Sequence, residues 1–206
     1  MNAIHCTAAL QRLASLGLEA ERSVPGLEEL LSCQLDLLRR NWSSRAFANT
    51  VWALAKMTYA EQPFLHEVSR PLASKNWSKE LQFSGLDVAH TAWAFAALLS
   101  SSDSLLKELE AATVEVAPEF RPQCVANTAW ALATLAVECP GAVWDALAAA
   151  ARRVLMEGKQ EPQHLANILW TFIKVTFEGA ETIALLMEQT SKELHRFNPQ
   201  CLSNTA

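Results

Sequence analysis

A short motif that recurs along the chain limits the possible folds more than any other feature of the sequence. The copy at 122–136 reads PQCVANTAWALATLA, and related copies begin at residues 44, 85, 162 and 199. Every copy has an Asn or a His at the same place, at intervals of 37 to 41 residues: Asn49, His90, Asn127, Asn167 and Asn204. Every complete copy has a Trp three residues later: Trp52, Trp93, Trp130 and Trp170. Self-similarity with such a period indicates an array of repeats.

A second helical pattern precedes each motif. Residues 26–40 place Leu27, Leu30, Leu31, Leu35 and Leu38 at the three- and four-residue spacing of one helix face. Similar segments occupy 63–75, 104–117, 143–156 and 180–194. One such pair of helices cannot bury its apolar surface alone, so successive pairs must stack. The sequence therefore predicts an all-α fold, an α-solenoid of helix–turn–helix repeats of about 37–41 residues.

We call the first helix of each pair the A helix and the motif helix the B helix. The B helices are apolar nearly all round, so we expect them to form the buried layer, and the more polar A helices to form the outer one. The predicted organisation is one array over 1–206, with a degraded partial repeat at 1–16, helix-pair repeats at 26–60, 61–99, 103–138 and 142–177, and a truncated repeat at 180–206. The chain ends inside a motif, so we expect a fragment or an incomplete gene model.

The composition argues against several classes of protein. Half of the residues are hydrophobic, so the chain can bury a core. No apolar run reaches the roughly 18 residues of a transmembrane helix, and the N-terminus lacks the character of a transit or signal peptide, so we expect no membrane contact. The five Cys are scattered without a metal-binding spacing, so we expect no metal and no cofactor.

Motifs that carry catalysis are also missing from the sequence. There is no Gly-rich phosphate loop, no Gly-x-Ser-x-Gly and no His-Glu-x-x-His. The five His residues are scattered, and nothing assembles a nucleophile with a base. We therefore expect neither an enzyme nor a small-molecule substrate.

One face of the B helices repeats an Asn/His and a Trp in every unit. We call it the Asn/Trp face, and it comprises Arg45, Asn49, Trp52 and Lys56; Leu86, His90, Trp93 and Ala97; Gln123, Asn127, Trp130 and Thr134; and Gln163, Asn167, Trp170 and Lys174. Trp can stack on bases, Asn and Gln can bond base edges, and Lys can meet phosphate. The predicted RNA-binding residues are the polar, charged and Trp members of this face, except Thr134, together with His164. They are Arg45, Asn49, Trp52, Lys56, His90, Trp93, Gln123, Asn127, Trp130, Gln163, His164, Asn167, Trp170 and Lys174. The alternative, which we favour over ligand binding, is that the Asn bonds the neighbouring repeat and the Trp fills the core.

A residue that is identical in every repeat cannot distinguish one base from another. Any reading of sequence would therefore fall to positions that vary. Two such rows accompany the motif. The first is Ala46, Asp87, Cys124, His164 and Cys201, and the second is Lys56, Ala97, Thr134 and Lys174.

The A helices tend to end in cations, which an α-solenoid would place along one edge. These phosphate-track candidates are Arg39, Arg40, Lys75, Arg152, Arg153, Lys192 and Arg196. They could follow the phosphates of a nucleic acid. Complementarity with the helix dipole, at about 0.3–1 kcal/mol each, explains the same pattern without a ligand. Both interpretations stay open.

The motif PQCVANTAWALATLA resembles the octotricopeptide repeat, whose hallmark is a Pro-Gln-x-Leu-Ala-Asn-x-x-Trp-Ala-Leu-Ala helix. It is also similar to repeats of FAST-kinase-domain proteins, of RAP-domain proteins and of subunits of the mitochondrial RNA-editing substrate-binding complex. The resemblance covers residues 44–206 clearly and 1–40 loosely. His90, Leu86 and Thr171 depart from the pattern, and the sequence shows no RAP domain.

This resemblance implies binding of single-stranded RNA in a mitochondrion or chloroplast, in transcript stability, processing, editing or translation. The competing hypothesis is a protein–protein scaffold of HEAT or armadillo type, which shares a period of about 40–47 residues and suits the net charge of −5 better. A steep salt dependence of RNA binding would favour the first hypothesis. A co-purifying protein partner with a flat salt response would favour the second.

Overall fold

The computed structural model describes residues 3–17, 25–40, 43–59, 62–70, 82–99, 103–135, 139–158 and 160–205. Over these residues its secondary structure consists of helices and short connections. The predicted all-α helical-repeat fold is confirmed. Lys75, one of the phosphate-track candidates, lies outside the described residues.

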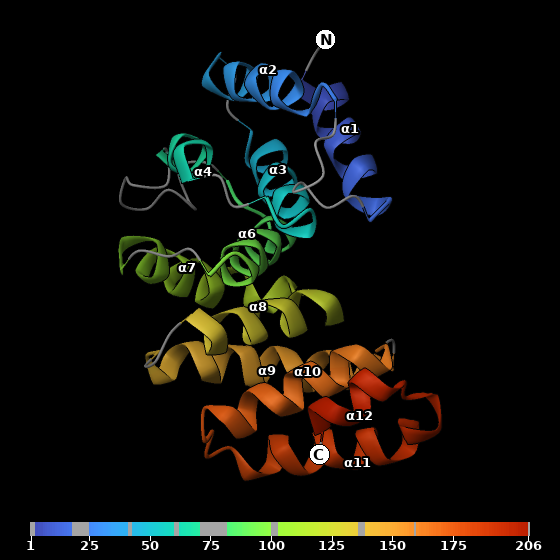
Figure 1. Ribbon diagram of the computed structural model, residues 1–206. Coiled ribbons are helices and arrows are strands. Elements are labelled where there is room, and N and C mark those ends of the chain that lie inside the picture. The colour runs from blue at the N-terminus through green and yellow to red at the C-terminus, as the bar shows by residue number, and fades with distance from the viewer. Residues whose placement is uncertain are drawn as a thin grey trace.

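The helices form two layers that run side by side through the molecule (Figure 1). The first layer holds the B helices: α1 (Ala3–Ser15), α3 (Ser44–Lys56), α6 (Gly85–Ala97), α8 (Pro122–Leu135), α10 (Pro162–Lys174) and α12 (Pro199–Thr205). The second holds the A helices: α2 (Leu27–Arg40), α4 (Gln62–Ser69), α7 (Asp103–Val116), α9 (Gly141–Glu157) and α11 (Ala180–Glu193). Two 3-10 turns, η2 (Ala117–Glu119) and η3 (Leu194–Arg196), follow α7 and α11.

Each B helix packs on the next B helix in the chain, from α1 to α12 through α3, α6, α8 and α10. The A helices likewise pack in succession, α2 on α4 and α7 on α9 on α11. Figure 1 shows the resulting stack, with α1 and α2 at one end and α11 and α12 at the other. Because contacts join neighbours in the sequence of units, the architecture is an α-solenoid.

Small residues on the B helices let them approach one another closely. On α8, Val125, Ala126, Thr128 and Ala131 are fully buried, and together they cover more than half of the circumference of the helix. A helix that is apolar on most sides must lie inside the protein. This burial explains why the B helices form the inner layer of the stack.

Gly85 stands at the first position of α6, where three other B helices have Pro. A Cβ atom on Gly85 would lie 2.8 Å from Cδ1 of Phe120, which is itself almost fully buried. This close approach explains why the α6 motif opens with glycine.

The N-terminal end of the stack has its own core and its own buried polar link. A cluster of apolar side chains from α1, α2, α3 and α4 is separate from the main core, which extends from α2 to α11. Inside it, fully buried Gln34 on α2 donates from Nε2 to Thr7 of α1 and to Thr50 of α3, both at 3.0 Å. One amide group thus joins three helices.

Candidate nucleic-acid interface

The Asn/Trp face lies in register across the consecutive B helices α3 and α6. Nδ1 of His90 on α6 is 3.2 Å from Oδ1 of Asn49 on α3, and the rings of Trp52 and Trp93 are 6.5 Å apart. Equivalent positions of neighbouring helices therefore meet, which requires the two helices to run parallel. All the Asn, His and Trp residues of this face on the four complete B helices are half-buried: Asn49, His90, Asn127, Asn167, Trp52, Trp93, Trp130 and Trp170.

At the α3–α6 junction the face becomes a cluster of rings. The His90 imidazole stacks on Trp52 with 5.6 Å between ring centroids and an interplanar angle of 27°. Trp93 is tilted by 42° against the same Trp52 ring. These contacts support the structural interpretation of the Asn and Trp rows at this junction, because they join one repeat to the next.

The burial of His90 sets its charge. Burial lowers the pKa of the imidazole, Asp87 opposes this effect, and the nearby Arg45 adds to it. The ring is therefore neutral at neutral pH. In the bond to the Asn49 carbonyl oxygen, Nδ1 of the neutral ring carries the proton and donates.

Two lysines of the face lie over its tryptophans. Nζ of Lys56 is 5.8 Å from the Trp52 centroid and 5.1 Å from the Trp93 centroid. Nζ of Lys174 is 4.7 Å from the Trp170 centroid. Both lysines are exposed, so a cation and an aromatic surface reach solvent together at two places on the face.

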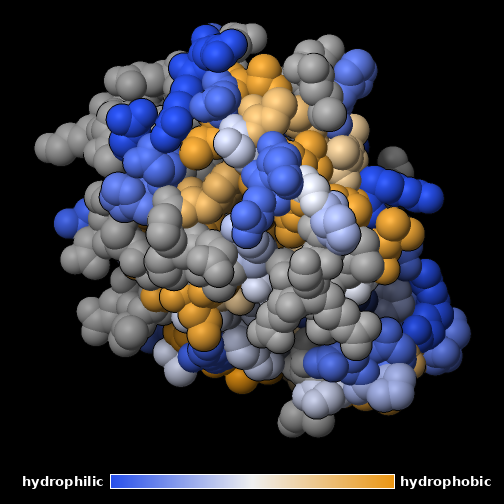
Figure 2. Space-filling model, turned by 45° about the horizontal axis from the view of Figure 1, so that its top comes forward, coloured by the Kyte–Doolittle hydropathy of each residue, from blue (hydrophilic) through white to orange (hydrophobic). Residues whose placement is uncertain are grey.

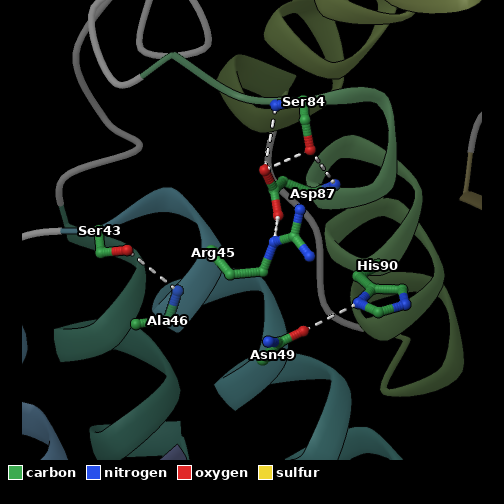
Figure 3. Close-up of polar contacts among 7 residues, drawn as sticks. All are labelled: Ser43, Arg45, Ala46, Asn49, Ser84, Asp87 and His90. Atoms are coloured by element: carbon green, nitrogen blue, oxygen red, sulfur yellow. Dashed lines mark hydrogen bonds and ion pairs between the residues drawn. The ribbon is translucent and has the colours of Figure 1, made fainter. Parts of the chain in front are cut away.

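Arg45 ties the start of α3 to the start of α6. Its Nε is 2.8 Å from Oδ1 of Asp87, whose side chain is only 4% exposed. Oδ2 of Asp87 accepts from the Ser84 hydroxyl at 2.6 Å and from the Ser84 backbone N–H at 3.0 Å, which closes a capping box on α6 (Figure 3). Arg45 thus has a structural partner, although 55% of its side chain remains exposed.

The first row of variable residues, which includes Asp87, faces the fold more than the solvent. His164 accepts from the Glu161 backbone N–H at 3.2 Å, and burial lowers the pKa of His164 while Glu161 opposes this effect. Cys124 and Cys201 are buried. In the second variable row, Lys56, Ala97 and Lys174 are exposed and Thr134 is half-buried, so a ligand can reach that row more easily.

Beside the starts of α6 and α8 the surface is hollowed by about 380 Å³. Its lining combines both charge signs with small and apolar residues: Arg45, Ser84, Gly85, Leu86, Glu119, Arg121, Gln123 and Cys124. Gln123 beside this hollow is exposed, and so is Gln163 at the start of α10, so both amides are available to a ligand.

Most of the described phosphate-track candidates already have partners within the protein. Arg39 pairs with Glu67 at 2.7 Å, Lys192 with Glu188 at 2.7 Å, and Arg196 with Glu193 at 2.7 Å.

On α9, Arg152 donates to the Thr182 hydroxyl, while Arg153 donates to the Phe120 carbonyl and pairs with Glu157 at 2.8 Å. Arg40 is exposed at the end of α2. The geometry therefore supplies a structural use for the five paired cations, in addition to the helix-dipole effect.

The sequence patterns did not predict two contacts of the site. The Lys56 ammonium serves two rings from different repeats, and the Asp87 carboxylate serves both a cap and an arginine. The Ser-x-x-Asp spacing at 84–87 is a capping-box pattern that could have shown the second feature.

Comparison of the sequence with protein-family models and with curated proteins gives no match. Within the described parts of the chain, no group of three or more His, Cys, Asp or Glu residues could hold a metal ion. Nor does any described helix have the length and apolar character needed to cross a bilayer.

Proposed function

We propose that this chain is an RNA-binding helical-repeat protein that acts in organellar RNA metabolism, on mitochondrial or plastid transcripts. The organelle and the process, which covers transcript stability, processing, editing or translation, rest on the resemblance of the motif to octotricopeptide repeats. In this proposal the chain binds RNA and does not catalyse a reaction.

The observation that supports RNA binding best is the register of the Asn/Trp face. Packed helices lie about 8–10 Å apart. One half-buried Trp and one half-buried amide or imidazole recur on each of α3, α6, α8 and α10, which pack in succession. Some helical-repeat proteins that bind single-stranded RNA read one base per repeat with two or three side chains.

The charge of the protein sets what binding should look like. The whole chain carries −5, while the Asn/Trp face presents Lys56 and Lys174 to solvent. Few phosphate contacts are available, so the salt dependence should come from a small number of side chains. Each phosphate contact to a single strand contributes about −0.7 to the slope of log K against log salt.

The test is binding of a pool of single-stranded RNAs to the full chain at about 50 mM and about 200 mM salt. The double variant Lys56→Gln/Lys174→Gln should bind more weakly, with a slope shallower by about 1.4. The matched control is Arg70→Gln/Lys107→Gln, which removes the same charge from exposed positions outside both the Asn/Trp face and the phosphate-track candidates. Equal losses in both variants would mean that the face has no special role, and no binding at low salt would refute the proposal.

The alternative function is a protein–protein scaffold without direct RNA contact. Besides the net charge, exposed apolar side chains favour it: Leu99 is 80% and Met156 is 78% exposed. Figure 2 shows hydrophobic patches among hydrophilic side chains on the face turned toward the N-terminal end of the stack. A protein partner that co-purifies and binds with a flat salt response, in the absence of RNA binding, would establish this alternative.

A further inference from the structure

We infer that Trp52, His90, Trp93 and Lys56 form a single nucleobase-binding site, which we call the α3–α6 platform. A base of single-stranded RNA stacks on Trp52 and Trp93, and Lys56 pairs with the neighbouring phosphate. This inference rests on the proposed function and goes beyond it, because it names one junction as the principal base-stacking site of the array.

The platform is built by two helices and is fixed before any ligand arrives. Trp52 comes from α3 and Trp93 from α6, with 6.5 Å between their rings. His90 stacks on Trp52 at 5.6 Å and bonds to Asn49, so the imidazole holds the Trp52 ring in place. A site whose rings are already ordered loses less conformational entropy when it binds a base.

Lys56 lies over these rings and is exposed to solvent. Its ammonium lies 5.1 Å from Trp93 and 5.8 Å from Trp52. A base that stacks here takes the place of the ammonium. The lysine then turns its ammonium to the phosphate next to that base. Lys56 thus contacts the rings in the free protein and the phosphate in the RNA complex.

The α10 repeat offers a natural comparison. Lys174 lies over one ring, Trp170, where Lys56 lies over two. Trp170 also packs against the main core as Trp93 does. The two sites therefore share a half-buried Trp and an exposed Lys, and they differ in the second ring and in the imidazole behind it.

The experiment compares Trp52→Leu and Trp93→Leu with the matched control Trp170→Leu, all in the full chain. Leucine keeps an apolar side chain at each position, and circular dichroism checks the helical content. Affinity for short oligo-U and oligo-A RNAs at low salt should fall about tenfold in each platform variant, as loss of one base stack predicts. The control should lose less than about threefold.

The outcomes separate this inference from the function on which it rests. Equal losses for all three tryptophans would overturn the platform and leave RNA binding in place. An absence of RNA binding by the unaltered chain would overturn the proposed function and the platform with it.

A second pair of variants covers the case in which a tryptophan variant fails to fold. Lys56→Glu and Lys174→Glu change exposed side chains, so neither removes buried contacts. Lys56→Glu should weaken binding at least tenfold more than Lys174→Glu, because it puts a negative charge between two rings and beside the phosphate. Equal losses in this pair would overturn the platform.

Discussion

His90 stands where the other motif copies have Asn, and it both bonds to Asn49 and stacks on Trp52. A single substitution within the pattern thus adds a ring contact between repeats. The same substitution adds a titratable group, whose pKa burial lowers with a contribution from Arg45 and against the effect of Asp87.

The lowered pKa of His90 predicts a pH dependence of stability. As the pH falls, the unfolded chain protonates this histidine near the ordinary pKa of about 6.5, and the folded chain protonates it only at lower pH. The contribution of the neutral His90 to the free energy of unfolding is therefore fully present above about pH 6.5 and is lost as the pH falls below it. In His90→Asn, the melting temperature should fall less between about pH 7 and about pH 5 than in the unaltered protein. His66→Asn, at an exposed position, is the control, and an identical fall in His90→Asn would contradict the prediction.

Gly85 gives a second prediction at the residue scale. Gly85→Ala would put a Cβ atom 2.8 Å from the buried Phe120 ring, so the free energy of unfolding should fall by about 1–3 kcal/mol. Gly141→Ala is the matched control, because it also begins a helix and a Cβ there meets nothing within 4 Å. Chemical denaturation measures both, and equal effects would contradict the close contact.

Among the elements, α6 depends on Asp87 at its start. Asp87→Ala removes the carboxylate half of the capping box on α6 and the partner of Arg45, so we expect a loss of about 1–3 kcal/mol in the free energy of unfolding. Glu67→Ala breaks the exposed pair with Arg39 and should cost less, because solvent screens exposed charges. Thermal or chemical unfolding measures the free energy of unfolding of both variants. A loss for Glu67→Ala as large as that for Asp87→Ala would contradict this account.

Helices α1 and α2 place two thiols in contact. Sγ of Cys6 is 3.6 Å from Sγ of Cys33, and burial together with Cys33 raises the pKa of Cys6. Hydrogen peroxide should oxidise Cys6 and Cys33 to a disulfide, in which the two thiols lose two hydrogens and the peroxide is reduced to two waters. The reaction should be slow at neutral pH and faster at alkaline pH, because the thiolate is the reactive form. The bond should raise stability by about 2–4 kcal/mol.

Mass spectrometry and thermal unfolding before and after oxidation measure this effect, and Cys33→Ser is the control. Cys139 offers an internal comparison, since burial and the nearby Glu110 raise its pKa to about 12. Cys139 should therefore stay unmodified under the same conditions. Oxidation without a link between Cys6 and Cys33 would contradict the prediction.

The elements also show how far sequence reasoning reaches. The described motif helices α3, α6, α8, α10 and α12 begin at the first residue of each motif copy, because a local repeat and local capping residues set helix starts. The contacts of Lys56 with Trp93 and of Arg45 with Asp87 join residues more than thirty positions apart. Their formation depends on the rotation of one helix against the next, which spacing alone does not fix.

At the scale of the whole molecule, the α-solenoid confines a local disturbance to its neighbours. Gln34→Ala removes the buried amide that joins α1, α2 and α3. Amide hydrogen exchange should become faster in these three helices and remain unchanged in α9 and α10. Gln163→Ala, at an exposed position, should change neither region, and faster exchange throughout the stack after Gln34→Ala would contradict this expectation.

The register in which Asn49 meets His90 and Trp52 meets Trp93 has a consequence for how such a chain can change its length. At this junction one unit offers the next the positions that it uses itself, so a duplicated copy of the unit inserted there would meet compatible surfaces. Gene duplication can thus lengthen the protein without inventing an interface.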